Sequence, residues 1–238
     1  MKWREAIRKE FRDMIRRGVW RKRTTAVPDG RRMVGSKWVF KKKKNGVYRA
    51  RLCALGYSQV PGVDYTENHA PVINDIAFRL MMATYLLQPQ FETDIVDVET
   101  AFLHGDLEHD IVMKTPEGLS IVDPTYKDIK AVDLHKTIYG LVQSARQWWK
   151  KFEAFLKKIG FENSQAEPCL FKRVDKNGTV YFCLYVDDAL MIGDRAAIDV
   201  AKEQIKKEFV IKEIGPLEEY IGCEVNERTF MNDIGLEL

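Results

Sequence analysis

The sequence of 238 residues contains few cysteines and no long apolar segment. Its four cysteines lie far apart, mostly inside apolar runs, and form no CxxC pair, so free thiols are favoured over disulfides or a zinc site. They are Cys53, Cys169, Cys183 and Cys223. No stretch reaches the roughly 20 apolar residues of a membrane-spanning helix, and the charged N-terminus MKWREAIRKEFRDMIRR lacks the apolar centre of a signal peptide. We therefore expect a soluble intracellular protein.

The formal net charge of +3 conceals an uneven distribution of charge along the chain. Residues 1–60 hold 19 Lys and Arg against 4 Asp and Glu, whereas the remainder holds 19 against 31. A basic segment of this kind is typical of proteins that bind polyanions, and an acidic remainder can attract metal cations. For the run Lys41 to Lys44, a simply solvated surface is the alternative.

The spacing of apolar residues predicts an α+β protein. Asn45-Gly46 between two apolar runs indicates a β-hairpin, and Ile76, Leu80, Ala83 and Leu87 form one apolar face of a helix. The predicted helices cover residues 3–17, 75–87, 144–159 and 195–209. The predicted strands cover residues 37–40, 47–55, 169–174, 180–193 and 220–225, with a further short strand in FETDIVDVETAF.

Two adjacent aspartates interrupt the apolar run CLYVDDALMIGD, which covers residues 183–194. Burying two carboxylates is costly unless a cation or hydrogen bonds compensate their charge. Asp-Asp also suits a hairpin turn, because Asp hydrogen-bonds its local backbone, so a purely structural turn is the alternative. Side-chain alternation predicts that Asp187 shares a face with Tyr185 and that Asp188 points the other way.

A second acid, Asp97, follows an apolar run in IVDVETAF. Two neighbouring strands that each supply a carboxylate can hold two Mg²⁺ ions about 3.5–4 Å apart, an arrangement that serves phosphoryl transfer. Asp94 and Asp106 are rival ligands. The pattern therefore predicts a metal site at the end of a sheet.

Several longer motifs occur in a fixed order along the chain. They are KWVFKKKKNGVYRARLCALGYSQVPGVDYTENHAPV, DVETAFLHGDL, KTPEGL, LHKTIYGLVQSARQWW, FENSQAEPCLF, YVDD and KEIGPLEEYIGCEV. Together they resemble the reverse transcriptases of copia-type LTR retrotransposons over nearly the whole chain. The resemblance implies an RNA-directed DNA polymerase, which adds dNTPs to a primer 3′ hydroxyl.

The same resemblance implies a right-hand polymerase with fingers and palm. The fingers are expected at about 1–72 and 105–146, and the palm at about 73–104 and 147–226, with an antiparallel palm sheet backed by helices. Residues 227–238 depart from the family, which continues there into a thumb and an RNase H domain. The thumb is therefore expected to be missing from residues 1–238.

The resemblance also assigns the chemistry of the predicted acidic site. Asp97, Asp187 and Asp188 are the expected catalytic residues. They are also the expected metal ligands, together with Val98. The expected cofactors are two Mg²⁺ ions, with Mn²⁺ as the alternative ion.

Further residues match family positions that contact the substrates. Phe102 is expected to be the steric gate that excludes a ribose 2′ hydroxyl, with an ordinary core Phe as the alternative. Arg51 and Arg49 are not separated by the sequence, although we favour Arg51. The expected dNTP-binding residues are Arg51, Arg49, Lys42, Thr100, Ala101, Phe102, Gln143 and Lys212. The expected nucleic-acid contacts are Lys41, Lys43, Lys44, Tyr139, Gly140 and Tyr185, and a close backbone approach is expected at Gly140.

These assignments imply an RNA or DNA template with its primer and dNTPs as partners, and no membrane. A cytoplasmic location is expected, in a virus-like particle for a complete element, with the nucleus as the alternative. Two other functions stay open. One is a catalytically inactive nucleic-acid-binding remnant, and the other is a metal-dependent phosphohydrolase, which leaves YGLVQ and the basic hairpin unexplained.

Overall fold

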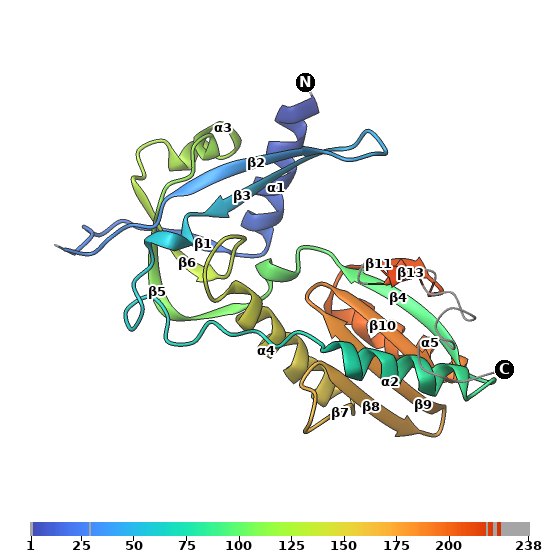
Figure 1. Cartoon of the computed structure of the whole chain (residues 1–238). Coiled ribbons are helices and arrows are strands. Elements are labelled where there is room, and N and C mark those ends of the chain that lie inside the picture. The colour runs from blue at the N-terminus through green and yellow to red at the C-terminus, as the bar shows by residue number, and fades with distance from the viewer. Residues whose placement is uncertain (1, 29, 218, 221–222, 225–238) are drawn as a thin grey trace. The chain divides into compact units, whose positions relative to one another are not determined.

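The computed structural model describes the backbone of residues 2–28, 30–217, 219–220 and 223–224 (Figure 1). The chain divides into two compact units: unit 1 comprises residues 1–70 and 100–151, and unit 2 comprises residues 71–99 and 152–238. The boundaries expected from the sequence, after residues 72, 104 and 146, differ from these by two to five residues. The expected tail, residues 227–238, lies outside the described residues.

Unit 1 combines a long N-terminal helix with two small antiparallel sheets. Its elements are α1 (Lys2–Arg16), β1 (Trp20–Lys22), β2 (Ser36–Lys42), β3 (Tyr48–Ala54), β5 (Asp106–Lys114), α3 (Leu119–Val122), β6 (Ala131–Lys136) and the first half of α4 (Ser144–Lys158). Strands β2 and β3 form a hairpin, and β1, β6 and β5 lie in that order in the second sheet.

The predicted first helix and hairpin both form, and they pack against each other (Figure 1). Helix α1 buries Phe11 and Met14, and buried residues of β3 alternate with half-buried ones. Gly46 has a φ of +81°, the left-handed conformation that favours glycine in a tight turn. One face of the hairpin therefore packs on α1, and the other face is left for polar residues.

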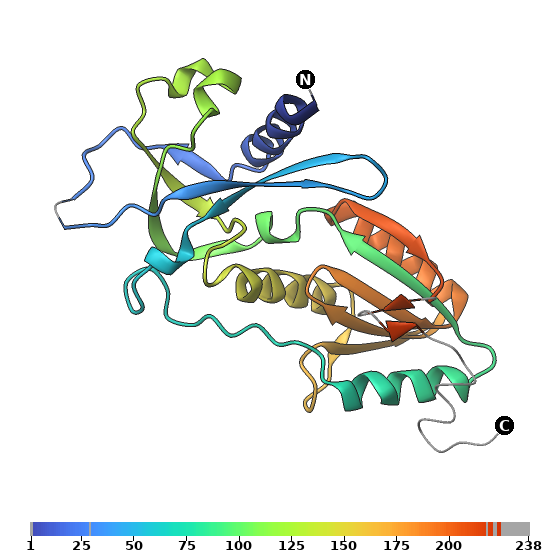
Figure 2. The same cartoon turned by 45° about the horizontal axis from the view of Figure 1, so that its top comes forward.

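Unit 2 is built on a six-stranded antiparallel sheet. Its elements are α2 (Asp75–Leu86), β4 (Glu92–Val98), the end of α4, β7 (Glu162–Asn163), β8 (Leu170–Asp175), β9 (Gly178–Tyr185), β10 (Asp188–Gly193), α5 (Arg195–Glu208), β11 (Ile211–Gly215), β12 (Glu219–Tyr220) and β13 (Cys223–Glu224). The strand order is β11-β4-β10-β9-β8-β7. Strand β4 thus lies between two strands that come about 90 residues or more later in the chain (Figure 2).

Aromatic side chains fill the core between this sheet and helices α4 and α5. The ring centroid of Phe152 lies 5.6 Å from that of Phe182 and 5.4 Å from that of Phe209. The predicted inward positions of α5 are buried, so this prediction is confirmed. They are Ile198, Ala201, Ile205 and Phe209.

Helix α2 forms as predicted, but the apolar face read from the sequence is exposed. Ile76 is 79% exposed and Leu80 is 63% exposed, whereas Phe78 and Met82 are buried. The helix DIAFRLMMATYL is apolar around most of its circumference, so periodicity does not decide which side packs. The single strand predicted over residues 220–225 is wrong, because β12 and β13 are separate short strands that pair with each other.

The cysteines and the helices bear on two expectations from the sequence: free thiols and no membrane-spanning helix. Among the described residues, Cys53, Cys169 and Cys183 take part in no disulfide, as predicted. In the described part of the chain, no helix has both the length and the apolar character needed to cross a membrane.

Candidate active site

Strand β4 carries Asp97 near the end of a buried apolar run. Ile95, Val96 and Val98 are each at most 2% exposed. β-branched residues favour the extended conformation, and side-chain alternation places Asp97 on the face opposite to Val96 and Val98. Asp97 itself is half-buried, so its carboxylate lies at the border of the apolar sheet.

The adjacent aspartates lie at a tight turn between β9 and β10. Strand β9 ends at Tyr185 and β10 begins at Asp188, so Val186 and Asp187 form a two-residue loop. Val186 has a φ of +57°, a left-handed conformation that costs a β-branched residue about 1–2 kcal/mol. Backbone strain of this kind concentrates at functional sites.

Strand register brings Asp97 and Asp188 directly opposite each other. Asp188 pairs with Asp97 of β4 on one side and with Tyr185 of β9 on the other. Directly paired residues in an antiparallel sheet have their side chains on the same face. The backbone N–H of Val98 donates to the carbonyl of Asp187 at 3.0 Å, which holds the turn against β4. The three predicted catalytic acids therefore come together at one end of the sheet.

The predicted orientation of the two adjacent aspartates is wrong. Alternation along one continuous strand placed Asp187, rather than Asp188, on the face of Tyr185. In the structure, Asp188 pairs with Tyr185 and shares its face. The two-residue loop reverses the chain and restarts the pairing, and a strand pattern alone does not reveal where this happens.

The electrostatics of the three acids agree with their proximity. The pKa of Asp188 is raised to about 6, first because burial disfavours its charged form and then because the negative charges of Asp187 and Asp97 repel it. A bound cation relieves such repulsion between carboxylates. We call Asp97, Asp187 and Asp188 the acidic cluster.

The donor chemistry of the acidic cluster fits a hard divalent cation. Mg²⁺ binds carboxylate oxygens and takes its other ligands from water and phosphate. Among the described residues, however, no group of three or more His, Cys, Asp or Glu side chains is arranged to hold a metal ion. The acidic cluster thus matches Mg²⁺ in the type and charge of its ligands but not in their present arrangement. The expected set of metal ligands, which includes Val98, stays a prediction.

The two rival acids form ion pairs with other residues. Asp94, on the face of β4 opposite to Asp97, is 5% exposed. Its Oδ2 accepts from Lys202 at 2.5 Å and from Arg195 at 3.2 Å. Asp106, in unit 1, accepts from Lys151 at 3.1 Å. Ion pairs with α5 and α4 thus compensate the charges of both acids.

Strand β11, which the sequence analysis did not predict, adds a cation beside the acidic cluster. Lys212 pairs with Asp97 in strand register, so the two side chains share a face. Lys212 is exposed. The β-branched residues of VIKEI were the available sequence signal for this strand. Lys212, which was expected to bind the nucleotide, therefore lies on the strand next to Asp97.

In unit 1, one face of the β2–β3 hairpin is strongly basic. Lys41 pairs directly with Arg49, and alternation places Arg51 on the same face. Lys42 pairs with Tyr48 on the other face, with its Nζ 5.7 Å from the Tyr48 ring centroid. Lys41 is therefore the lysine that shares a face with the two arginines, and the expected nucleotide contact of Lys42 stays a prediction.

Arg51, Tyr139 and Phe102 are in contact within unit 1. The guanidinium carbon of Arg51 lies 4.5 Å from the Tyr139 ring centroid. Tyr139 in turn meets Phe102 edge-on, with 5.3 Å between the ring centroids. Nε of Arg51 is buried and has no hydrogen-bond partner among the described residues. These contacts favour Arg51 over Arg49 as the arginine beside the predicted steric gate.

Thr137, which the sequence analysis missed, holds the backbone of the loop that carries Phe102. Its fully buried hydroxyl donates to the carbonyl of Phe102. The loop begins at Thr100, whose φ is +57°, and continues as a short 3₁₀ helix over Ala101–Leu103. No local sequence signal marks Thr137, because a threonine beside apolar residues is common in protein cores.

Gly140 makes the close backbone approach expected from the sequence. Its φ is +89°, and a Cβ added there would lie 2.3 Å from the carbonyl oxygen of Ala54. The backbone N–H of Ala54 donates to the carbonyl of Tyr139 at 2.7 Å. The Tyr139-Gly140 turn is therefore tied to the end of β3, the strand that carries Arg51.

Gln143 has a different environment from the one expected of a nucleotide contact. It is 3% exposed. Its Nε2 donates to the carbonyl of Asp64 at 3.1 Å, and its Oε1 accepts from Gln59 at 3.1 Å. In this conformation the Gln143 side chain links two loop residues of unit 1 by hydrogen bonds. Its contact with a nucleotide stays a prediction, and such a contact would require these hydrogen bonds to break.

The remaining expected nucleic-acid contacts are accessible. Lys43 and Lys44 lie at the exposed turn of the hairpin, and Tyr185 is half-buried beside Asp188. Their roles stay predictions.

Comparisons with known proteins agree with the motifs. Residues 19–237 match the family described as "Reverse transcriptase (RNA-dependent DNA polymerase)". The chain is 36% identical over 233 residues to the retrovirus-related Pol polyprotein from transposon TNT 1-94 of Nicotiana tabacum, covering 94% of this chain and 17% of that protein. It is 28% identical over 246 residues to the truncated transposon Ty1-A Gag-Pol polyprotein of Saccharomyces cerevisiae, covering 100% and 19%.

A solved structure with a similar chain is the foamy viral protease-reverse transcriptase in complex with double-stranded DNA. The TM-score is 0.44 at 14% sequence identity, over 89% of this chain and 31% of the viral one. This chain spans less than a fifth of the two polyproteins above. Because the family match covers nearly all of its residues, the chain belongs to the reverse transcriptase (RNA-dependent DNA polymerase) family, as a copia-type reverse transcriptase domain.

Proposed function

We propose that this chain joins nucleotides on a primed RNA template. The primer 3′ oxygen forms a bond to the α-phosphorus of a dNTP, the bond to pyrophosphate breaks, and the hydroxyl proton is released. Unit 2 serves as the palm and unit 1 as the fingers of a right-hand polymerase. The observation that carries the proposal is the convergence of Asp97, Asp187 and Asp188 at one end of the unit 2 sheet.

The acidic cluster holds two divalent cations, Mg²⁺ or Mn²⁺, in this proposal. When bound, such ions supply positive charge that favours ionisation of the primer hydroxyl and neutralises the leaving pyrophosphate. The protein contributes three carboxylates whose backbones are fixed before substrate arrives. Asp97 and Asp188 sit on adjacent strands, and the turn with Asp187 is tied to Val98. A rigid set of charges of this kind needs little reorganisation during the reaction.

The basic side chains of unit 1 bind the triphosphate in this proposal. Arg51 offers a planar fork suited to phosphate oxygens, and Lys41 adds a point charge from the same hairpin face. Packing on Tyr139 holds the guanidinium of Arg51 in place. Phe102, held through its carbonyl by Thr137, excludes the 2′ hydroxyl of a ribonucleotide. Backbone N–H groups of Thr100 and Ala101 bind further triphosphate oxygens.

Primer extension on poly(rA)/oligo(dT) with dTTP and Mg²⁺ tests the proposal. We expect the Asp187→Asn, Asp188→Asn variant to lose at least about a hundredfold in rate, because the charge that gathers the cations is removed. The matched control is Glu162→Gln, Glu208→Gln, which removes two exposed acids from the same unit and should extend like the wild type.

The competing function is a nucleic-acid-binding remnant without catalysis. If the wild type extends no better than the double Asp→Asn variant while both bind primer–template equally, the remnant is the correct description. Omitting divalent ions should abolish extension by the wild type and leave the unfolding temperature of the double variant unchanged.

A further inference from the structure

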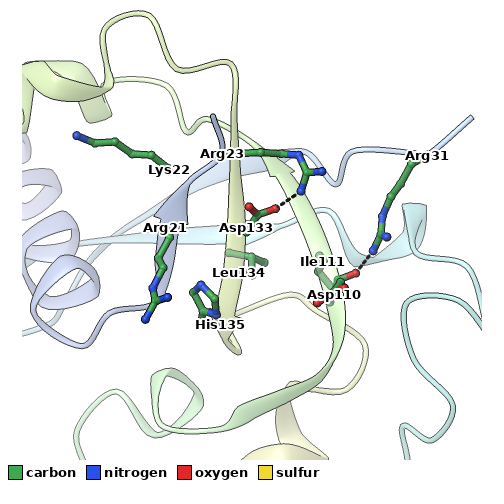
Figure 3. A pocket seen from close by; sticks show the side chains of 9 residues that line it. All are labelled: Arg21, Lys22, Arg23, Arg31, Asp110, Ile111, Asp133, Leu134 and His135. Atoms are coloured by element: carbon green, nitrogen blue, oxygen red, sulfur yellow. Dashed lines mark hydrogen bonds and ion pairs between the residues drawn. The ribbon is translucent and has the colours of Figure 1, made fainter. Parts of the chain in front are cut away.

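A basic pocket lies on the three-stranded sheet of unit 1 (Figure 3). Its volume is about 420 Å³, and it is lined by residues of and beside β1, β5 and β6, together with Arg31. Four lining residues are Lys or Arg and two are Asp. None of them is among the residues expected to bind metal or nucleotide. We propose that this pocket binds the phosphodiester backbone of a single nucleic-acid strand.

Side-chain alternation collects most of these charges on the outer face of the sheet. Arg21 pairs with Asp133 in register, and Arg23 and His135 lie two residues further along on the same face. Figure 3 shows Arg21 and His135 pointing to the same side. Lys22 points elsewhere, with its Nζ 4.7 Å from the ring centroid of Tyr126. The arginines therefore supply most of the positive charge that a ligand in the pocket would meet.

Two of these arginines are already oriented by the protein. Nη1 of Arg23 donates to Asp133 at 2.6 Å, and its Nη2 donates to the carbonyl of Ala26 at 3.3 Å. Arg31 donates from Nη2 to the carbonyl of Asp110. A guanidinium has five N–H donors, so each retains donors for a ligand. Side chains that are held in place lose less entropy when they bind phosphate oxygens.

The lining favours phosphate groups over bases. No Phe, Tyr or Trp is among the described residues that line the pocket, so a base finds little to stack on. The two aliphatic residues that line it, Ile111 and Leu134, are at most 4% exposed. Asp133 is paired with Arg23, which leaves an excess of positive charge. Arg21 and Arg31 lie on opposite sides of the pocket in Figure 3, an arrangement that suits successive phosphates of one strand.

The inference goes beyond the proposed polymerase activity and can be tested without it. Binding of a labelled, single-stranded abasic deoxyribose-phosphate oligomer is measured by fluorescence anisotropy in EDTA, without dNTPs. The pocket variant is Arg21→Gln, Arg31→Gln. The matched control is Lys176→Gln, Lys207→Gln, which removes the same charge from exposed positions of unit 2.

We expect the pocket variant to bind about tenfold more weakly than the wild type at about 50 mM salt, because two phosphate contacts are lost. The slope of log affinity against log salt should fall by about 1.4, at about 0.7 for each contact. The control should change affinity less than about twofold. If the double variant unfolds at a lower temperature, Arg21→Gln alone, at an exposed position, provides the same comparison.

Equal binding by the pocket variant and the control overturns the proposal. A competition experiment can also overturn it. Inorganic phosphate is added while chloride keeps the ionic strength constant. If phosphate displaces the oligomer from the wild type but not from the pocket variant, the pocket is a site for free phosphate. The Asp187→Asn, Asp188→Asn variant should bind the oligomer at least as well as the wild type. Failure of the polymerase proposal is thus distinguishable from failure of this one.

Discussion

The two units of this chain carry opposite net charge and arrange it differently. Unit 1 holds 26 Lys and Arg against 13 Asp and Glu, a balance of +13, whereas unit 2 holds 12 against 22, a balance of −10. In unit 1, cations lie spread over the outer faces of the hairpin and of the three-stranded sheet. In unit 2, three acids are concentrated at the end of one sheet.

In the proposed function, this difference would make the two units respond differently to a polyanionic substrate. Spread cations attract a phosphate backbone without selecting a sequence. A compact group of carboxylates repels the same backbone until cations neutralise it. Binding by unit 1 should therefore be independent of divalent ions, whereas chemistry at unit 2 should require them.

The largest expected effect separates two acids of the same strand. Asp97→Asn should abolish primer extension while the fold is kept, because it removes charge from the acidic cluster. Asp94→Asn should leave the rate per folded molecule unchanged and lower the free energy of unfolding by about 3 kcal/mol, because it breaks a buried ion pair with Lys202. Primer extension and urea unfolding measure the two effects.

If instead Asp94→Asn abolished extension in molecules that remain folded, Asp94 would belong to the catalytic site. The separation of roles between the two faces of β4 would then be incorrect.

A second prediction concerns the gate in unit 1. Phe102→Ala should raise the incorporation of UTP relative to dTTP by roughly 10–100-fold, because a steric barrier to the 2′ hydroxyl is removed. Single-nucleotide incorporation with both substrates measures this ratio. The control Phe155→Ala removes a half-buried ring that packs 5.1 Å from Phe209 in unit 2 and should leave the ratio unchanged. An unaltered ratio in the Phe102 variant would reduce that residue to a packing role.

A third prediction distinguishes the two arginines of the hairpin. Arg51→Lys should raise the KM for dTTP about tenfold, because lysine lacks the planar fork and the packing on Tyr139. Arg49→Lys should raise the KM less than about threefold. Steady-state extension at varied dTTP measures both values. Larger sensitivity at Arg49 would reverse the assignment that the Tyr139 contact supports.

The smallest expected effect concerns residues with a strained backbone. Among the described residues, Thr100 of unit 1 and Val186 of unit 2 are the two non-glycine residues with positive φ. Val186→Gly should raise the free energy of unfolding by about 0.5 kcal/mol, since relief of strain slightly exceeds the entropy cost of glycine. Urea unfolding measures this change. A loss of more than about 1 kcal/mol would mean that contacts of the valine side chain outweigh the strain.

Much of the local structure follows from short-range patterns. The Asn45-Gly46 hairpin and the apolar face of α5 each follow from residues a few positions apart, and both are found. At Gly140 the residue type allowed a close backbone approach, but its partner, Ala54, lies far away in the sequence. Strand β11 and the buried side of α2 depend on distant partners. VIKEI lacks the period of two that marks a strand, and α2 is apolar around most of its circumference, so the sequence left both undecided.

The sequence by itself determined which residue types are available for chemistry: the paired acids, the basic hairpin and the aromatic after Asp97. Only the tertiary structure decided that Asp188 faces Asp97, that Arg51 rather than Arg49 packs on Tyr139, and that Thr137 holds the carbonyl of Phe102. The physical reason is that side-chain periodicity is set within one segment, whereas register and contact between segments are set by the packing of the whole unit.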